Sequence, residues 1–296
     1  MSSAGVRMGN SVGDMTTKQQ SAAHAEPIGV MPHFRRLLRS YATSGGVRGL
    51  WHEVQSLGTH LALYPLGFVG APLRPRELNN GHEVYETPIV QVHGYFHNRS
   101  GFFFMSRELR EQGFRWIHGM NYNPLRSGVP ELAEWFGKHI EDVMRISGAK
   151  RVHVVGHSLG GVIARWYIQE LGGERHVDHC VTIGTPHHGT VAAYLGPGPA
   201  ARDMRPGSDV IQRLERGFSK SKVKYVNLYS DLDFLIIPTS SALLPEQRNV
   251  HQDLIGDLGH TSLLVSEELI DQVSSHLIAA ELNGRLAEVR PLRQRA

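Results

Sequence analysis

Short apolar segments alternate with longer amphipathic segments from about residue 85 onward. The apolar segments have the length of buried strands, while the others place an apolar residue every three or four positions, as along one face of a helix. We expect strands at 89–92, 114–118, 151–155, 177–183, 222–229 and 250–254. We expect helices at 106–112, 132–144, 161–171 and 269–278. This alternation predicts an α/β fold with a mainly parallel central sheet and helices on both faces.

The flanking segments have different patterns and suggest a division of the chain around a main domain at 85–284. Residues 1–30 are rich in small and polar residues, so they bury too little apolar surface to offset their ordering entropy, and we expect disorder there. Residues 31–84 predict a helical extension. Residues 285–296 contain four arginines and predict a basic C-terminal tail.

The extension at 31–84 has two interpretations. Its apolar stretches are interrupted by glycine, histidine and proline, which favours a helix packed on the main domain. Alternatively, it lies on a lipid surface with Trp51, Tyr64 and Phe68 as its apolar face. The sequence has no apolar stretch of transmembrane length and no clear signal-peptide pattern. We therefore favour a cytoplasmic or peripherally membrane-associated protein.

The composition is that of a soluble globular protein, with 41% hydrophobic and 20% charged residues. The formal net charge is only +3, and the basic residues form no patch that suggests a nucleic-acid partner. The single cysteine, Cys180, excludes an intramolecular disulfide. Because Cys180 lies in an apolar run, we expect a buried and unreactive thiol.

The segment Gly156–Gly160, with the sequence GHSLG, matches the pattern G-x-S-x-G. It follows a predicted strand and precedes a helix that starts with small residues. A nucleophilic serine needs this context, because a sharp strand-to-helix turn exposes its hydroxyl and flanking glycines let the two elements approach. We therefore predict that Ser158 is a nucleophile.

A serine hydroxyl needs a base to remove its proton, and the base needs an acid to orient it. On this type of fold they follow the serine in the order acid, then histidine. His260 is the candidate base, because it lies in a loop after the last predicted strand and follows a flexible glycine. His251 and His276 are weaker candidates, since one would lie on a strand and the other inside a helix.

Two aspartates compete for the role of the acid in the loop after the strand at 222–229. Asp233 adjoins the apolar run 234–237, where a desolvated carboxylate would hold an imidazole best. Asp231 is the alternative, although it could instead cap the loop by accepting backbone hydrogen bonds. We favour Asp233.

An acyl-transfer reaction also needs two backbone N–H groups facing the oxyanion of its tetrahedral intermediate. Leu159, which follows the nucleophile, would supply one of them. Tyr95 would supply the other, because it follows the first strand and Gly94 permits an unusual backbone angle there. We predict an oxyanion hole formed by the amides of Leu159 and Tyr95.

Five motifs in this order resemble those of bacterial triacylglycerol lipases and esterases of the α/β-hydrolase superfamily. They are His93–Gly94, Gly156–Gly161, Gly184–Thr190, Tyr229–Ile236 and Gly259–His260. The resemblance covers about residues 87–280. It implies an acyl-ester or lipid substrate, an acid at Asp233, oxyanion donors at Tyr95 and Leu159, and no cofactor.

Two segments depart from the smaller members of that family. The first 85 residues have no counterpart there, and the segment 190–222 is longer than a loop and predicts a small cap or lid. The pair His187 and His188 is by itself not a metal site, and we expect no metal.

The leading hypothesis is therefore an ester hydrolase that forms an acyl-enzyme on Ser158. One alternative is an acyltransferase that uses the same acyl-enzyme but passes the acyl group to an acceptor other than water. The other is a binding protein that has this fold without its catalysis. Sequence does not separate hydrolysis from transfer, because the difference lies in water exclusion and acceptor binding.

Overall fold

The computed structural model describes residues 39, 41–70 and 83–293. In this part of the chain, six strands form one sheet in the order β2-β1-β3-β4-β5-β6, and every neighbouring pair is parallel. They are β1 (Ile89–Val92), β2 (Ile117–Met120), β3 (Val152–His157), β4 (Val177–Ile183), β5 (Lys224–Tyr229) and β6 (Val250–Leu254). The predicted parallel sheet is confirmed.

The second strand begins later than we predicted from the apolar residues at 114–118. Phe114 forms only a single bridge, with Tyr85. Its N–H donates to the carbonyl of Leu109 and so closes the preceding helix. Because that backbone group is already used, continuous pairing begins only at Ile117.

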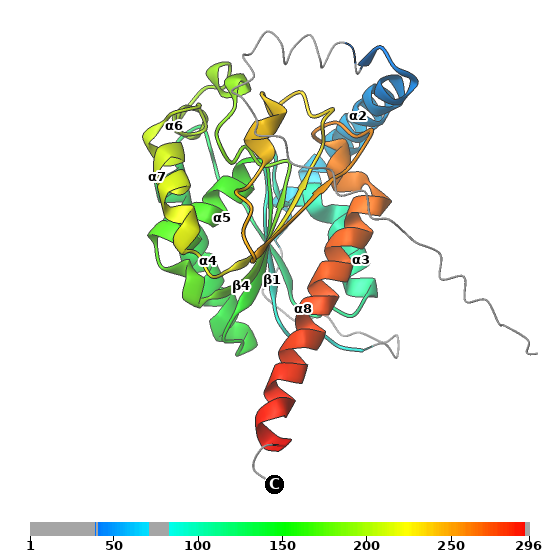
Figure 1. Ribbon diagram of the computed structural model, residues 1–296. Helices are drawn as coiled ribbons and strands as arrows, with labels where there is room; N and C mark the ends of the chain where they lie inside the picture. Colours follow the sequence, from blue (N-terminus) through cyan, green and yellow to red (C-terminus); the bar gives the residue numbers. More distant parts are fainter. Residues whose placement is uncertain (1–38, 40, 71–82, 294–296) are drawn as a thin grey trace, which may run out of the picture.

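Helices cover both faces of the sheet (Figure 1). On one face lie α4 (Val129–Ser147) and α5 (Leu159–Glu170), and on the other lie α3 (Phe103–Glu111) and α8 (Glu267–Arg293). Short helical turns connect the elements: η2 (Arg99–Phe102), η3 (Gly173–Arg175), η6 (Thr239–Ala242) and η7 (Ser262–Val265). The predicted layers are thus present, and each face has its own apolar core.

Burial explains why the central strands have continuous apolar sequences. All residues of β1 and β3 are buried, so both of their faces pack against side chains. On one side Phe136 of α4 and Val162 of α5 belong to a buried cluster, and on the other Leu109 of α3 and Val273 of α8 do so. This packing holds the carboxyl ends of the parallel strands together at one edge of the sheet.

The segment between β4 and β5 forms a small cap, as predicted. It contains η4 (Val191–Tyr194), α6 (Pro199–Asp203), α7 (Asp209–Gly217) and η5 (Phe218–Lys220). Helix α7 packs Val210, Ile211 and Leu214 into the same cluster as α4 and α5. Leu195, in contrast, is 91% exposed. The cap therefore combines a firmly packed helix with an exposed apolar tip.

The N-terminal extension contains α2 (Ser44–Leu63) and η1 (Tyr64–Phe68). Trp51 and Phe68 are exposed, whereas Tyr64 is partly buried and its carbonyl accepts a hydrogen bond from Asn98. The described helices include none that is long and apolar enough to cross a bilayer. The disorder expected for residues 1–30 concerns a segment outside the described residues.

The boundary that we predicted at residue 285 is not the end of a structural element. Helix α8 continues to Arg293. Arg285 forms an ion pair with Glu83 and donates to the carbonyl of Val84 at 2.8 Å. This arginine is therefore fixed to the segment that precedes β1.

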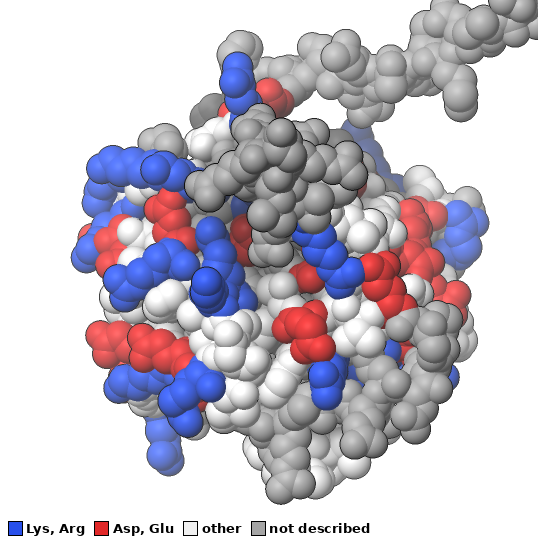
Figure 2. Space-filling model, turned by 90° about the horizontal axis from the view of Figure 1, so that it is seen from below, with Lys and Arg blue, Asp and Glu red and all other residues white. Residues whose placement is uncertain are grey.

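Basic and acidic side chains are interspersed on the face seen from below (Figure 2). This mixture agrees with the small net charge of +3. Oppositely charged neighbours leave little long-range field on that face.

Candidate active site

Ser158 lies at the turn between β3 and α5 and has backbone angles of φ 54° and ψ −123°. A positive φ is uncommon for a residue with a side chain and indicates stored backbone strain. The Ser158 N–H donates to the carbonyl of Ile183 on β4 at 2.8 Å, which holds the turn against the sheet. The sequence motif thus adopts the sharp turn that it predicted.

Glycines in the motif are required because the backbones of two elements meet there. A Cβ on Gly160 would lie 2.0 Å from the carbonyl oxygen of Val92, and one on Gly156 would lie 2.7 Å from the Gly161 nitrogen. Neither contact can be relieved by a flexible side chain. The first turn of α5 therefore packs directly on the end of β1.

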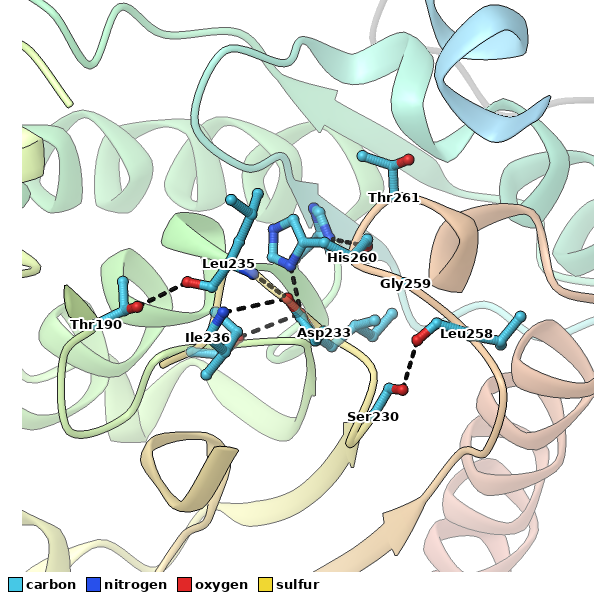
Figure 3. A network of polar contacts seen from close by, with 12 residues as sticks. Thr190, Ser230, Asp233, Leu235, Ile236, Leu258, Gly259, His260 and Thr261 are labelled. Carbon is cyan, nitrogen blue, oxygen red and sulfur yellow. Dashed lines mark hydrogen bonds and ion pairs between the residues drawn. The ribbon is translucent and has the colours of Figure 1, made fainter. Parts of the chain in front are cut away.

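Asp233 and His260 form a buried pair (Figure 3). The Nδ1 atom of His260 lies 2.6 Å from Oδ2 of Asp233, and the two residues are only 4% and 1% exposed. The other oxygen, Oδ1, accepts the N–H groups of Leu235 and Ile236 at 2.9 and 3.2 Å. These bonds orient the carboxylate toward the imidazole. Asp231 lies two residues earlier and is less buried.

The environment of His260 acts on its pKa in two directions. Burial lowers the pKa, but the Asp233 carboxylate raises it through its charge and hydrogen bond, and Glu53 adds to that effect. The net result is a raised pKa. With Asp233 ionised, Nδ1 carries the donated proton, and the neutral ring then has its free electron pair on Nε2.

The serine turn and the Asp233–His260 pair lie next to each other. The Nε2–H of His157, the residue before Ser158, donates to the carbonyl of His260 at 3.1 Å. The two imidazole rings are 4.6 Å apart between centroids. From the other side, a Cβ on Gly184 would lie 3.1 Å from Oδ2 of Asp233 and 3.5 Å from Nδ1 of His260. Loops after β3, β4, β5 and β6 therefore meet at this point.

The predicted oxyanion donors flank the same turn. A Cβ on Gly94 would lie 3.0 Å from the Cβ of Ser158, so the loop after β1 touches the serine. Leu159 is the first residue of α5, where a backbone N–H has no acceptor within the helix. The hydroxyl of Tyr95 donates to the carbonyl of Pro197 in the cap. These contacts join the loop after β1, the turn at Ser158 and the cap.

The other residues considered from sequence lie in different surroundings. His251 on β6 and His276 on α8 contact each other, with ring centroids 4.6 Å apart. Burial raises the pKa of the Cys180 thiol to about 12. His187 is buried and forms hydrogen bonds with Arg165 and Asn227.

Sequence reasoning missed Glu53 of α2. This buried carboxylate accepts hydrogen bonds from the backbone of Thr261 and Ser262, directly after His260. A signal was present, because the polar residues Glu53, Ser56 and His60 recur at helical spacing and so lie along one stripe of the helix. Interpreting that stripe required knowing which loop it faces.

The family model described as alpha/beta hydrolase fold matches residues 87–207. Among curated proteins, the chain is 26% identical to a triacylglycerol lipase of Vibrio cholerae over 163 residues, which are 51% of this chain and 47% of that protein. It is also 26% identical to lecithin-cholesterol acyltransferase-like 4 of Arabidopsis thaliana over 109 residues, 36% of this chain and 19% of that protein. The chain thus spans less than half the length of these curated relatives.

Solved structures with the same fold include lipases. The mature lipase BlEst2 of Bacillus licheniformis superposes with a TM-score of 0.58 at 18% identity, covering 70% of this chain and 99% of that one. Lipase B of Aspergillus fumigatus superposes with a TM-score of 0.54 at 21% identity, covering 63% and 50%. At such identities the likeness establishes the fold. The chain therefore has the α/β-hydrolase fold, and the proteins to which it is similar include lipases.

Proposed function

We propose that this protein is a serine hydrolase that cleaves carboxylic esters through an acyl-enzyme on Ser158. One observation carries the proposal: the buried Asp233–His260 hydrogen bond of 2.6 Å lies beside the strained turn of a serine. Such a pair supplies the oriented base that a serine hydroxyl needs in order to act as a nucleophile.

In the first half of the reaction, Nε2 of His260 takes the proton of the Ser158 hydroxyl as its oxygen attacks the ester carbonyl. The carbonyl oxygen becomes an oxyanion, which the amides of Tyr95 and Leu159 stabilise. The tetrahedral intermediate then collapses, its bond to the alcohol oxygen breaks, and the alcohol leaves with the proton from His260. The acyl group remains on Ser158.

In the second half, His260 removes a proton from water, and the resulting nucleophile attacks the acyl carbonyl. Collapse of this intermediate releases the carboxylic acid and returns the proton to Ser158. Asp233 keeps its charge throughout and stabilises the imidazolium that forms in each half. No redox change occurs, so the cycle needs no redox cofactor.

We further propose that the substrate is presented at a lipid surface, which the outer side of α2 contacts. This side, η1 and the residue after η1 carry apolar side chains that are each at least 49% exposed: Val47, Leu50, Trp51, Val54, Leu57, Leu61, Leu66, Phe68 and Val69. On α2 they recur at helical spacing. An amphipathic helix with such a face lies in a membrane interface. Contact there would bring the neighbouring His260 loop close to the lipid.

Covalent labelling tests the proposal. A fluorophosphonate probe should modify the wild-type chain and leave Ser158→Ala unmodified, and labelling that persists in this variant would refute the assignment. Turnover of p-nitrophenyl esters of increasing chain length, with and without micelles, would then identify the acyl preference. Product analysis with a short alcohol present would separate hydrolysis from acyl transfer.

A further inference from the structure

We propose that Glu53 of α2 is a positioning residue, which sets the place of the His260 imidazole by holding the backbone on both sides of it. The inference rests on the proposed function, because it assumes that His260 is the base. It gives the N-terminal extension a role in the reaction itself, separate from any contact with lipid.

Three donors of the loop converge on the Glu53 carboxylate. Oε1 accepts the Thr261 N–H at 2.9 Å and the Thr261 hydroxyl at 3.0 Å, and Oε2 accepts the Ser262 N–H at 2.9 Å. Glu53 is only 2% exposed, and none of the ion pairs among the described residues includes it. The hydrogen bonds to this carboxylate thus come from backbone and hydroxyl donors of the loop, and such charge-assisted hydrogen bonds are strong.

The carboxylate also packs against the residue before His260. A Cβ on Gly259 would lie 2.5 Å from Oε2 of Glu53. Glu53 thus touches the chain immediately before His260 and bonds the chain immediately after it. His60, two helical turns further along α2, adds a hydrogen bond from its Nε2 to the Thr261 carbonyl at 3.3 Å.

Helix α2 also touches the loop of the acid. The Tyr41 hydroxyl, just before the helix, donates to the carbonyl of Leu232 at 2.6 Å, one residue before Asp233. A Cβ on Gly49 would lie 2.8 Å from the Leu232 side chain and 3.1 Å from the carbonyl of Asp257. One element outside the sheet therefore holds both loops whose side chains must meet.

Position matters here because proton transfer depends steeply on geometry, and a displacement of about 1 Å in a reacting group can cost roughly 10²-fold in rate. Without the Glu53 carboxylate, the loop would keep the bonds from His157 to the His260 carbonyl and from His60 to the Thr261 carbonyl, but the Thr261 and Ser262 donors would lose their acceptor. We therefore expect the loss to appear in turnover instead of substrate binding.

The first test uses Glu53→Gln, which keeps the shape but presents an N–H₂ group where a backbone donor needs an acceptor. Active sites are counted by stoichiometric labelling with fluorophosphonate, so kcat refers to folded enzyme. We expect kcat for p-nitrophenyl butyrate to fall about 10-fold to 100-fold and KM to change less than about twofold. Gln55→Ala, on the exposed side of the same helix, is the matched control and should equal wild type.

The second test keeps the inference falsifiable if Glu53→Gln does not fold. Thr261→Val removes a single donor to Glu53, and should lower kcat several-fold in the wild-type background. In the Glu53→Gln background the same change should have little further effect, since contacting residues are not additive. Glu53→Asp should recover part of the lost kcat.

The outcomes separate this inference from the proposed function. Fluorophosphonate labelling that persists in the Ser158→Ala variant would refute the proposed function. Labelling that is lost in Ser158→Ala, together with wild-type kcat per site in Thr261→Val and in any folded Glu53→Gln, would overturn only the role of Glu53. A lower melting temperature with unchanged kcat per site would make Glu53 a stabilising residue and likewise overturn the inference.

Discussion

His157 and His260 lie in contact, with the Nε2 atom of the first 3.1 Å from the carbonyl oxygen of the second. Burial holds the pKa of His157 well below its usual range, so this ring stays neutral and serves as a donor. The residue before the proposed nucleophile thus holds the backbone of the proposed base. This bond links the strand-to-helix turn to the loop that carries His260.

Removing the serine hydroxyl should abolish covalent catalysis. For Ser158→Ala we expect kcat to fall by at least about 10⁴-fold, because the nucleophile is lost while the binding groups remain. Initial rates on p-nitrophenyl esters measure this. A rate within about tenfold of wild type would contradict the assignment of Ser158.

Two aspartate variants test which carboxylate orients the base. Asp233→Asn should lower kcat by roughly 10³-fold to 10⁴-fold, since an amide favours the wrong imidazole tautomer. Asp231→Asn should change it by less than about threefold, because Asp231 does not touch His260 through any hydrogen bond of the described residues. The reverse order of effects would assign the acid to Asp231.

The raised pKa of His260 predicts an acid-sensitive enzyme. The base must be neutral, so kcat/KM should fall as pH decreases through a pKa above the usual value of about 6.5. In a variant with Asp233→Asn, the residual activity should show this inflection at lower pH. A pH–rate profile measures both, and identical inflections would exclude the Asp233 charge as the cause.

The same shift makes a prediction for stability. A raised pKa in the folded state means that the folded chain binds the His260 proton more tightly than the unfolded chain does. The resulting stabilisation of the fold is fully present below the unfolded pKa of His260. It should be lost as pH rises through the folded pKa of His260. Urea unfolding of wild type and Asp233→Asn across this range would measure the difference, which should shrink as pH rises.

The close contact at Gly160 predicts that adding a single methyl group there strongly destabilises the fold. Gly160→Ala would place a Cβ 2.0 Å from a backbone oxygen, and we expect a loss of roughly 1–3 kcal/mol in the free energy of unfolding. Gly58→Ala on α2 is the control, because a Cβ there meets nothing within 4 Å. Urea titrations in which both variants match wild type would contradict the contact.

The exposed apolar face of α2 predicts that turnover depends on a lipid surface. Replacing Trp51 and Leu57 by serine should lower the ratio of turnover on vesicle-borne ester to turnover on soluble ester, because apolar area available to the interface is lost. Vesicle flotation should show weaker binding in parallel. An unchanged ratio would reject the lipid contact, while leaving the reaction on Ser158 unaffected.

Local patterns in the sequence determined much of the molecule. Runs of apolar residues have the period and length of their elements, so β1, β4 and β6 match the predicted ranges. The turn at Ser158 was also predictable, because its strain needs flanking glycines that are close in the chain. The choice of Asp233 and His260 as candidates used the chain order of serine, acid and histidine that is typical of this type of fold.

Tertiary structure alone decided which side chains meet. Asp233 and His260 are 27 positions apart, and Glu53 is 208 positions from Thr261, so no periodicity along the chain relates them. The start of β2 depended on a hydrogen bond that closes α3, and the length of α8 exceeded its apolar pattern. The sequence determines which residues can be buried and which can donate hydrogen bonds. Which residues become partners across such separations depends on the packing of the whole chain.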